Sequence, residues 1–138
     1  MIGLPDDGLK TFSGAIINIT STAGKWGSRN QSAYNTSKHA VVGLTRCVAL
    51  EASAHQVTVN AICPGFVQTD MVENLKKQAA ESAGASVDAF MQAALARVPL
   101  GRIITPEEIA AMACWLASAE CSFSTGGVFD ISGGRATY

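Results

Sequence analysis

Hydrophobic and polar positions along the chain predict an alternation of strands and helices. Residues Gly14–Thr20 form a short apolar, β-branched run, and Val57–Cys63 has the same character, so both are predicted to be buried strands. Between them, apolar residues recur at helical spacing from roughly Ala33 to Ala54, and Ser32 is a candidate cap for this helix. A strand, a helix and a second strand in this order predict a right-handed crossover and parallel pairing.

The rest of the chain predicts more helices and one further strand. Two helical pieces are expected between about Thr69 and Leu100, and the second has an apolar face. Thr105, Pro106 and Glu108 together have the pattern of a helix start with a capping box. The buried stripe of that helix is predicted to comprise Ile109, Met112, Ala113 and Leu116. A glycine-containing turn then leads into a final strand at residues 128–131.

Length and charge limit the classes of function. The chain has 138 residues, enough for one modest domain, and 48% of them are hydrophobic. The formal net charge of −1 and the absence of a Lys/Arg cluster give no electrostatic footprint for nucleic acid. No apolar run reaches about 18 residues, so no membrane span is predicted.

The cysteines and the first residues favour a cytoplasmic protein. No Cys-x-x-Cys pair occurs among Cys47, Cys63, Cys114 and Cys121, and the two histidines stand at no metal-ligand spacing. We therefore predict no metal site and reduced, buried thiols. The first residues have neither a basic flank nor an apolar core, so they are not predicted to be a signal peptide.

The most informative chemical pattern is a tyrosine and a lysine four positions apart on the long predicted helix. Tyr34 and Lys38 would stand on one face of that helix. A neighbouring ammonium stabilises a phenolate, and the hydroxyl of Ser21 at the same place can hydrogen-bond a substrate oxygen. Taken alone, this spacing is also common in helices with a half-buried tyrosine and a solvated lysine. The strand–loop–helix order, however, delivers Ser21 and Tyr34 to one end of a parallel sheet, where open α/β folds place their ligands.

Ordered motifs from about Ser13 onward resemble the carboxy-terminal half of a short-chain dehydrogenase/reductase of the single-domain type. Five blocks match that family in order: Ile17–Ser21, Tyr34–Lys38, Val59–Gly65, Thr69–Met71 and Ile131–Gly134. Within the family, the sequence is most similar to 3-oxoacyl-thioester reductases and bacterial aromatic-polyketide ketoreductases, through Ala96–Arg102 and the Gly-Gly…Thr-Tyr ending. Five ordered blocks are far more specific than any one of them, which disfavours an unrelated helix-rich binding protein.

The resemblance implies a fold and an internal organisation. The chain is expected to be the carboxy-terminal half of a doubly wound, parallel-sheet Rossmann-type α/β fold, with three strands and flanking helices. Residues 14–68 would form the catalytic strand–helix–strand unit, residues 69–100 a substrate lid, and residues 101–138 the last helix and strand. Residues 1–13 match no motif of the family. Homodimers or homotetramers are expected of the full-length protein.

The resemblance also implies an activity, the interconversion of a ketone (3-oxoacyl or similar) and a secondary alcohol by hydride transfer with NAD or NADP. Tyr34 is expected to be the acid in reduction, Lys38 to assist it and to hydrogen-bond the nicotinamide ribose, and Ser21 to hold the substrate oxygen. Cofactor contacts are expected of Tyr34 and Lys38 and, at the nicotinamide end, of Pro64, Gly65, Val67 and Thr69. Val67 would bind through its backbone and Thr69 through its hydroxyl, a role compatible with capping a helix.

The chain lacks the glycine-rich strand–turn–helix motif that cradles the pyrophosphate of a dinucleotide. In the resembled family, that motif lies in the first half of the fold. We therefore expect a fragment, a partial gene product, or a piece whose other half is supplied elsewhere. Its strand at residues 14–20 is expected to be an exposed apolar edge, which favours self-association. The alternative function is a catalytically silent half-domain that acts only in association or assembly.

Overall fold

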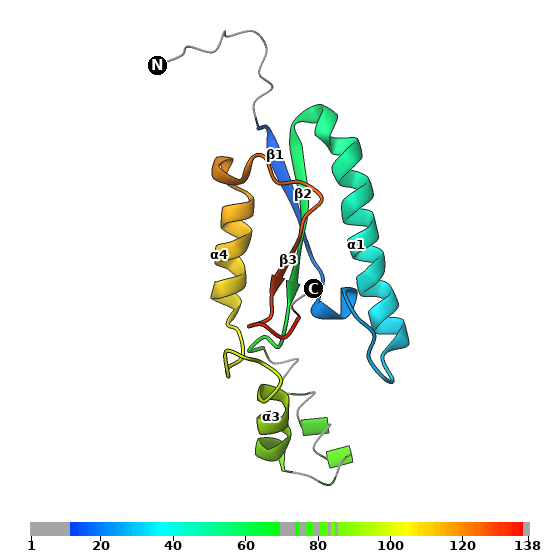
Figure 1. Ribbon diagram of the computed structural model, residues 1–138, viewed down its shortest axis with the longest axis vertical. Helices are drawn as coiled ribbons and strands as arrows, with labels where there is room; N and C mark the ends of the chain where they lie inside the picture. Colours follow the sequence, from blue (N-terminus) through cyan, green and yellow to red (C-terminus); the bar gives the residue numbers. More distant parts are fainter. Residues whose placement is uncertain are drawn as a thin grey trace.

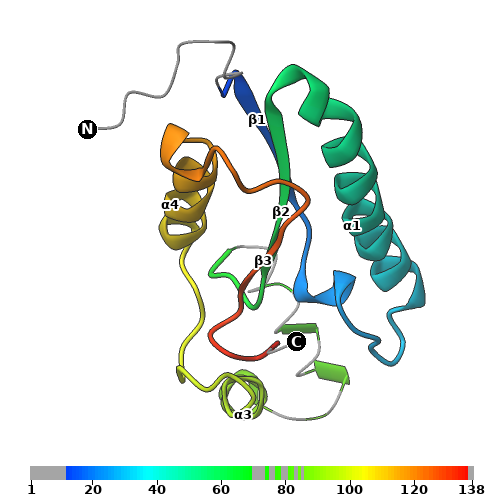
Figure 2. The ribbon, with the colours of Figure 1, turned by 45° about the horizontal axis from the view of Figure 1, so that its top comes forward.

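The computed structural model describes residues 12–69, 74, 77–78, 81–82, 84 and 86–136 (Figure 1). Three parallel strands form one sheet in the order β1-β2-β3. Helix α1 covers one face of this sheet and helix α4 covers the other, so the fold has three layers (Figures 1 and 2). This arrangement confirms the predicted parallel α/β fold with three strands and flanking helices.

The strands are β1 (Gly14–Ile19), β2 (Val57–Pro64) and β3 (Val128–Ile131), and the helices are α1 (Ser32–Ala52), α3 (Val87–Leu95) and α4 (Pro106–Leu116). Short 3-10 turns also occur, namely η1 (Thr22–Gly24), η2 (Ser53–His55) and η3 (Ala119–Cys121). The predicted strands are thus present at nearly the predicted bounds. Of the two helical pieces expected between residues 69 and 100, the second is α3, and the first lies largely outside the described residues.

Strand β2 lies in the middle of the sheet and carries the core. Its residues from Thr58 onward are buried. Ile62 packs with Leu116 and Cys121 in a buried cluster. The stripe predicted for α4, Ile109, Met112 and Ala113, packs around that cluster. Because burying one large aliphatic side chain contributes roughly 1.5–3 kcal/mol, this cluster holds α4 on the sheet.

Helix α4 begins with the predicted capping box. The Thr105 hydroxyl accepts a hydrogen bond from the Glu108 N–H at 3.4 Å, and the Glu108 carboxylate accepts one from the Thr105 N–H at 2.9 Å. Arg102 also donates to Glu108 from both ends of its guanidinium. These hydrogen bonds, first that of Arg102 and then that of Thr105, lower the pKa of Glu108 to about 2. Glu108 therefore remains ionised and keeps the start of α4 in place.

The bounds of α1 differ slightly from those predicted. Ser32 is the first helical residue and does not cap the helix. The cap position is Gln31, which makes no side-chain cap bond, so the predicted Ser32 cap is wrong. The helix ends at Ala52, because residues 53–55 tighten into η2 and Gln56 takes a left-handed φ of 57°.

The prediction of buried thiols is correct for two of the four cysteines. All four are free, with Cys63 and Cys121 buried and Cys47 and Cys114 exposed. Near Cys47, α1 also exposes 57% of Leu44 and 80% of Leu50. The apolar residues of α1 are spread around the helix instead of lining one face, so spacing alone does not show which are buried.

Two asparagine side chains join neighbouring elements. Asn60 in β2 is fully buried, and its amide donates to the Ser124 carbonyl at 2.7 Å and accepts from the Gly127 N–H at 3.0 Å. Asn18 in β1 donates to the Thr45 hydroxyl in α1 at 3.0 Å. Asn60 therefore fixes the turn before β3 to β2, and Asn18 fixes α1 to the sheet.

Strand β1 forms one edge of the described sheet. It pairs with β2 on one side, from Gly14 opposite Val57 to Ile19 opposite Ile62. The side chains of Ile16 and Ile19 are 44% and 50% exposed. Within the described residues, the expectation of an exposed apolar edge is confirmed.

Candidate active site

The carboxyl end of β1 is fastened to α1 at Lys38. The Thr20 N–H donates to the Ile62 carbonyl at 2.8 Å, and the Thr20 hydroxyl donates to the Lys38 carbonyl at 3.0 Å. Gly24 in η1 lies so close that an added Cβ would stand 2.8 Å from the Lys38 carbonyl oxygen. Because no side chain fits at residue 24, the turn that follows Ser21 packs directly against the backbone of α1.

Tyr34 and Lys38 lie side by side on the first turns of α1. The Lys38 Nζ is 5.6 Å from the centroid of the Tyr34 ring. A cation within about 6 Å of an aromatic centroid interacts favourably with the ring. The Tyr34 side chain is 46% exposed, so its phenol is open to a ligand. The helical spacing thus places an ammonium beside an accessible phenol.

Ser21 follows Thr20 directly and caps η1. Its Oγ accepts a hydrogen bond from the Ala23 N–H at 3.1 Å. A hydroxyl has one donor site and two acceptor sites, so this bond leaves the Ser21 O–H able to donate. The backbone of Ser21 adjoins Cys63 at the end of β2. Burial, the largest influence, raises the pKa of the Cys63 thiol against smaller opposing effects of Lys25 and the Ser21 backbone, which makes Cys63 a poor nucleophile.

Asn35, the residue after Tyr34, holds the loop between η1 and α1 against the helix. Its amide donates to the Trp26 carbonyl at 2.7 Å, and its side chain is buried. The Asn35 carbonyl bonds to the His39 Nδ1 at 2.9 Å. Asn35 was not among the candidate residues, because a single asparagine within a helix carries no motif. It fixes the position of the helix turn that bears Tyr34.

The segment after β2 packs against the end of β3 and pairs with Ile104. Pro64 ends β2, and a Cβ added to Gly65 would stand 3.0 Å from the Ser132 Cα, so the ends of β2 and β3 approach too closely for a side chain there. Val67 forms a parallel bridge with Ile104. In this bridge, Ile104 bonds to the residues on either side of Val67, at 3.0 and 2.9 Å. The N–H and C=O of Val67 itself therefore point away from Ile104.

The structure brings most of the candidate residues to one edge of the sheet. Parallel strands end on the same side, so Ser21 after β1 and the Pro64–Thr69 segment after β2 both lie at the carboxyl edge. The hydrogen bond from Thr20 to the Lys38 carbonyl holds the Ser21 end of this edge against the helix of Tyr34 and Lys38. Thr69 is half-buried. The remaining motif residues Asp70, Met71, Thr137 and Tyr138 lie outside the described residues.

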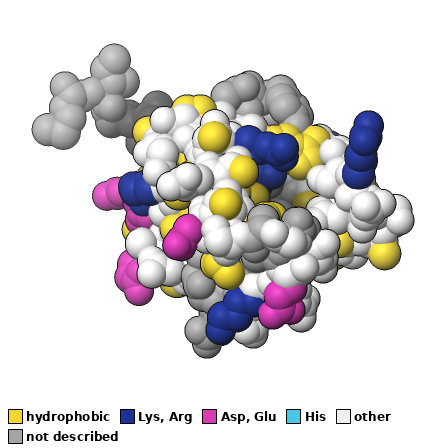
Figure 3. Space-filling view, turned by 90° about the horizontal axis from the view of Figure 1, so that it is seen from below, with side chains coloured by type: hydrophobic (Ala, Val, Ile, Leu, Met, Phe, Trp, Pro, Cys, Tyr) yellow, Lys and Arg dark blue, Asp and Glu magenta, His cyan; other side chains and the backbone are white. Residues whose placement is uncertain are grey.

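A cluster at this edge combines an arginine with two aromatic rings, and we call Trp26, Phe66 and Arg135 the aromatic–arginine cluster. The Arg135 Cζ is 4.2 Å from the centroid of the Phe66 ring and 5.1 Å from that of Trp26. Nearby, Lys25 and Asp130 form an ion pair at 3.3 Å, which ties η1 to the end of β3. Figure 3 views this end of the molecule and shows basic side chains beside hydrophobic ones. Sequence motifs did not indicate the cluster, because its members come from three distant segments.

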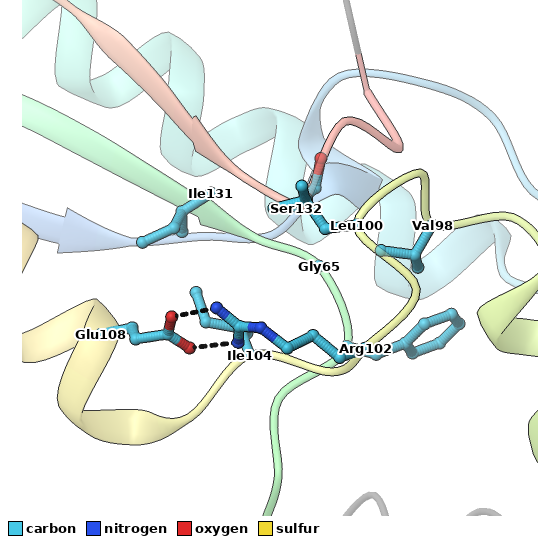
Figure 4. Close-up of a pocket in the computed structure, with 10 residues that line it drawn as sticks. Gly65, Val98, Leu100, Arg102, Ile104, Glu108, Ile131 and Ser132 are labelled. Atoms are coloured by element: carbon cyan, nitrogen blue, oxygen red, sulfur yellow. Dashed lines mark hydrogen bonds and ion pairs between the residues drawn. The ribbon is translucent and has the colours of Figure 1, made fainter.

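A cavity of about 110 Å³ lies on the α4 side of Gly65 (Figure 4). Val98 and Leu100 border it together with Ile131 at the end of β3, and the Arg102–Glu108 pair stands at its edge. None of the three candidate catalytic residues lines it. We therefore place the candidate chemistry at the open surface by Tyr34 and not in this cavity.

Neither a candidate metal site nor a membrane-spanning helix occurs within the described ranges. No three His, Cys, Asp or Glu side chains there are placed to share a metal ion. No helix in that part of the chain is both long and apolar enough to cross a bilayer.

Comparison with known proteins agrees with this arrangement. Residues 6–136 match the model of a family described as enoyl-(acyl carrier protein) reductase. The match begins inside residues 1–13, which had shown no family motif. A 3-oxoacyl-(acyl-carrier-protein) reductase from Thermotoga maritima is 40% identical over 126 residues, which are 91% of this chain and 47% of that protein. A 2-dehydro-3-deoxy-L-rhamnonate dehydrogenase (NAD(+)) from a Sphingomonas species is 38% identical over 94% of this chain and 48% of its own length.

Solved structures give the same result. The crystal structure of an actinorhodin polyketide ketoreductase with NADPH has a TM-score of 0.85 and 35% identity, over 90% of this chain and 48% of that chain. The chain therefore spans about half the length of the relatives it matches. Over that half, the family model, the sequences and the fold agree, and the chain belongs to the short-chain dehydrogenase/reductase family of oxidoreductases.

Proposed function

We propose that this chain forms the acid–base part of an NAD(P)-dependent reductase of 3-oxoacyl or similar ketones. One observation carries the proposal. The hydrogen bond from Thr20 to the Lys38 carbonyl holds the Ser21 end of β1 against the helix that bears Tyr34 and Lys38. The likeness to a 3-oxoacyl reductase and a polyketide ketoreductase supports the choice of substrate class.

The three side chains have complementary roles in this proposal. In reduction, the Ser21 hydroxyl donates a hydrogen bond to the carbonyl oxygen of the substrate, and the Tyr34 hydroxyl gives that oxygen its proton. The Lys38 ammonium stabilises the negative charge that remains on the phenolate. A bound nicotinamide supplies the hydride to the carbonyl carbon. In oxidation, the Tyr34 phenolate takes the proton from the alcohol.

The described residues fit the nicotinamide end of a cofactor. The Val67 N–H and C=O are directed away from the Ile104 bridge, which suits them to bind a carboxamide. Pro64 and Gly65 precede Val67 in this segment, and Thr69, two residues after Val67, provides a hydroxyl. Within the described residues, however, no glycine-rich turn joins a strand to a helix, as a pyrophosphate site requires. We infer that another segment supplies the phosphate-binding half and selects NAD or NADP.

The test joins the amino-terminal half of the Thermotoga maritima relative to residue 12 of this chain, and we call the product the joined protein. We expect it to reduce ethyl acetoacetate with NADPH or NADH. Tyr34→Phe is expected to lower turnover by about 10²–10⁴-fold, with circular dichroism unchanged. Thr36→Ala, an exposed residue on the same helix, is the matched control and is expected to have no effect.

Two outcomes would contradict the proposal. If Tyr34→Phe retains turnover within about threefold, Tyr34 is not the acid. If the joined protein folds and binds NADPH but reduces no ketone, the segment acts only as a structural or association unit. Measuring cofactor binding by fluorescence separates this result from a failure to fold.

We further propose that residues 69–100 form a lid over the substrate. The Leu100 N–H donates to the Gly133 carbonyl at 3.1 Å, and a Cβ added to Gly133 would stand 2.8 Å from a methyl of Val98. The end of this segment is therefore packed on the turn after β3, at the same edge as Ser21. Phe90 is half-buried and apolar, which suits the underside of a lid.

The proposal also includes a homo-oligomeric state and a cytoplasmic location. Leu44 and Leu50 are exposed on α1, which supports a homodimer or homotetramer that covers them. Light scattering of the joined protein measures this directly, and a monomer at all concentrations would contradict it. The four free cysteines support a cytoplasmic protein.

A further inference from the structure

Arg135 of the aromatic–arginine cluster lies next to both halves of the candidate site. One of its neighbours, Trp26, belongs to the loop that Asn35 ties to the helix turn of Tyr34, through a bond of 2.7 Å. Its other neighbour, Phe66, immediately precedes Val67 in the segment proposed to contact nicotinamide. The guanidinium therefore joins the loop before α1 to the segment that contains Val67.

Arg135 lies in a partly buried, positively charged environment. Burial, and after it the charge of Arg97, lower the pKa of Arg135. Among the described residues, neither arginine forms an ion pair or a side-chain hydrogen bond. The carboxylates of Asp130 and Glu108 are already paired, with Lys25 and Arg102. A guanidinium that has no counter-ion among the described residues attracts an anion.

The way Arg135 is held leaves its hydrogen-bond donors available. A guanidinium is planar, has five N–H donors along its edge and stacks with its faces on aromatic rings. The rings of Phe66 and Trp26 contact Arg135 at 4.2 and 5.1 Å and limit the movement of the group. An edge of paired N–H donors matches the two oxygens of a carboxylate or phosphate. A purely structural contact with the rings would not explain why this edge has no ion-pair or hydrogen-bond partner among the described residues.

We propose that Arg135 binds a carboxylate or phosphate on the part of the substrate that does not react. This inference rests on the proposed ketone reductase activity and names the substrate class: ketones that carry a negative charge a few bonds from the carbonyl. Such a site orients the carbonyl toward Tyr34 and disfavours neutral ketones, because a neutral group leaves the Arg135 charge without an anion.

The experiment compares matched substrates in the joined protein. Levulinate and methyl levulinate are the same ketone with and without a carboxylate, and dihydroxyacetone phosphate and dihydroxyacetone differ by a phosphate. Arg135→Leu is expected to lower kcat/KM about 10–100-fold for a charged member, the usual value of a hydrogen bond to a charged group, and less than about twofold for its neutral partner. The pair with the larger loss identifies the anion as carboxylate or phosphate. Arg135→Lys is expected to keep part of the preference.

The matched control is Arg46→Leu, which removes an exposed arginine from α1 and is expected to change neither pair. Equal losses for charged and neutral ketones on Arg135→Leu would overturn the inference, since they would show a structural role only. If neither charged nor neutral ketones are reduced, the proposed function fails. The anion site at Arg135 is then tested by a binding measurement alone. For that measurement, levulinate and inorganic phosphate are titrated into the Trp115→Phe chain while the fluorescence of Trp26 is recorded. Saturable binding that Arg135→Leu abolishes supports the anion site, and no binding to the parent chain refutes it.

Discussion

Replacing Asn60 by alanine tests how the turn before β3 is held. The change removes a bond of 2.7 Å to the Ser124 carbonyl and one of 3.0 Å from the Gly127 N–H. A buried polar group left without its partner costs about 1–3 kcal/mol. Ser124 and Gly127 are half-buried, so water reaches them in part, and we expect a total loss near the lower end, about 2–4 kcal/mol. This is a large share of a typical unfolding free energy of about 5–15 kcal/mol.

The assay is urea unfolding of the joined protein, in which Asn60→Ala is expected to lower the midpoint without changing the slope. Asn18→Ala provides an internal scale. It removes one bond to Thr45, whose hydroxyl keeps its own bond to the Val41 carbonyl at 2.7 Å, so we expect a loss of only about 1 kcal/mol. If Asn60→Ala loses no more stability than Asn18→Ala, the reasoning about unsatisfied groups in this turn is refuted.

Three other predictions concern the site, the pH dependence and the free chain. Gly24→Ala forces a Cβ to within 2.8 Å of the Lys38 carbonyl oxygen and is expected to lower turnover by up to about 10²-fold. The control Gly43→Ala, whose Cβ would have no atom within 4 Å, is expected to preserve activity, and equal activities of the two variants would contradict the prediction. The lowered pKa of Glu108, about 2 against an ordinary 4.5, means that its ionised form stabilises the fold above pH 4.5 and that this contribution is lost as pH falls through 2. Glu108→Gln is therefore expected to flatten the unfolding free energy across that range, and an unchanged slope would refute the assignment. The free chain is expected to self-associate through the β1 edge, and Ile16→Lys is expected to weaken this association. A free chain that is monomeric by light scattering and unfolds cooperatively would exclude the prediction.

Local chemistry made much of the fold predictable. The capping box of Thr105 and Glu108 depends on residues three apart, and it occurs as predicted. The strands were predictable because short β-branched runs bounded by turns have few other solutions. The exposure of Cys47 in α1 and Cys114 in α4 could not be predicted, since it depends on which side of each largely apolar helix packs on the sheet. That choice is made by tertiary packing, which periodicity does not record.

Some features of the candidate site could be predicted from the sequence, and others required the structure. Tyr34 and Lys38 are brought together by helical spacing alone, so a sequence motif is sufficient to indicate them. The aromatic–arginine cluster depends on chain crossings between residues 26, 66 and 135, which no motif spans. Likewise, the approach of Gly24 to Lys38 is a property of how the turn packs on the helix. Contacts of this kind require the three-dimensional arrangement.

The bridge between Val67 and Ile104 makes the segment between these residues an interchangeable module. Its two ends are already held together by the body of the protein, so closing the loop does not depend on what lies within it. Doubling the length of a closed loop costs only about 0.6 kcal/mol. Homologous proteins can therefore exchange or lengthen this module without moving Tyr34, Lys38 or Ser21. If this segment is the proposed lid, substrate choice can diversify while the proposed proton-transfer residues stay constant.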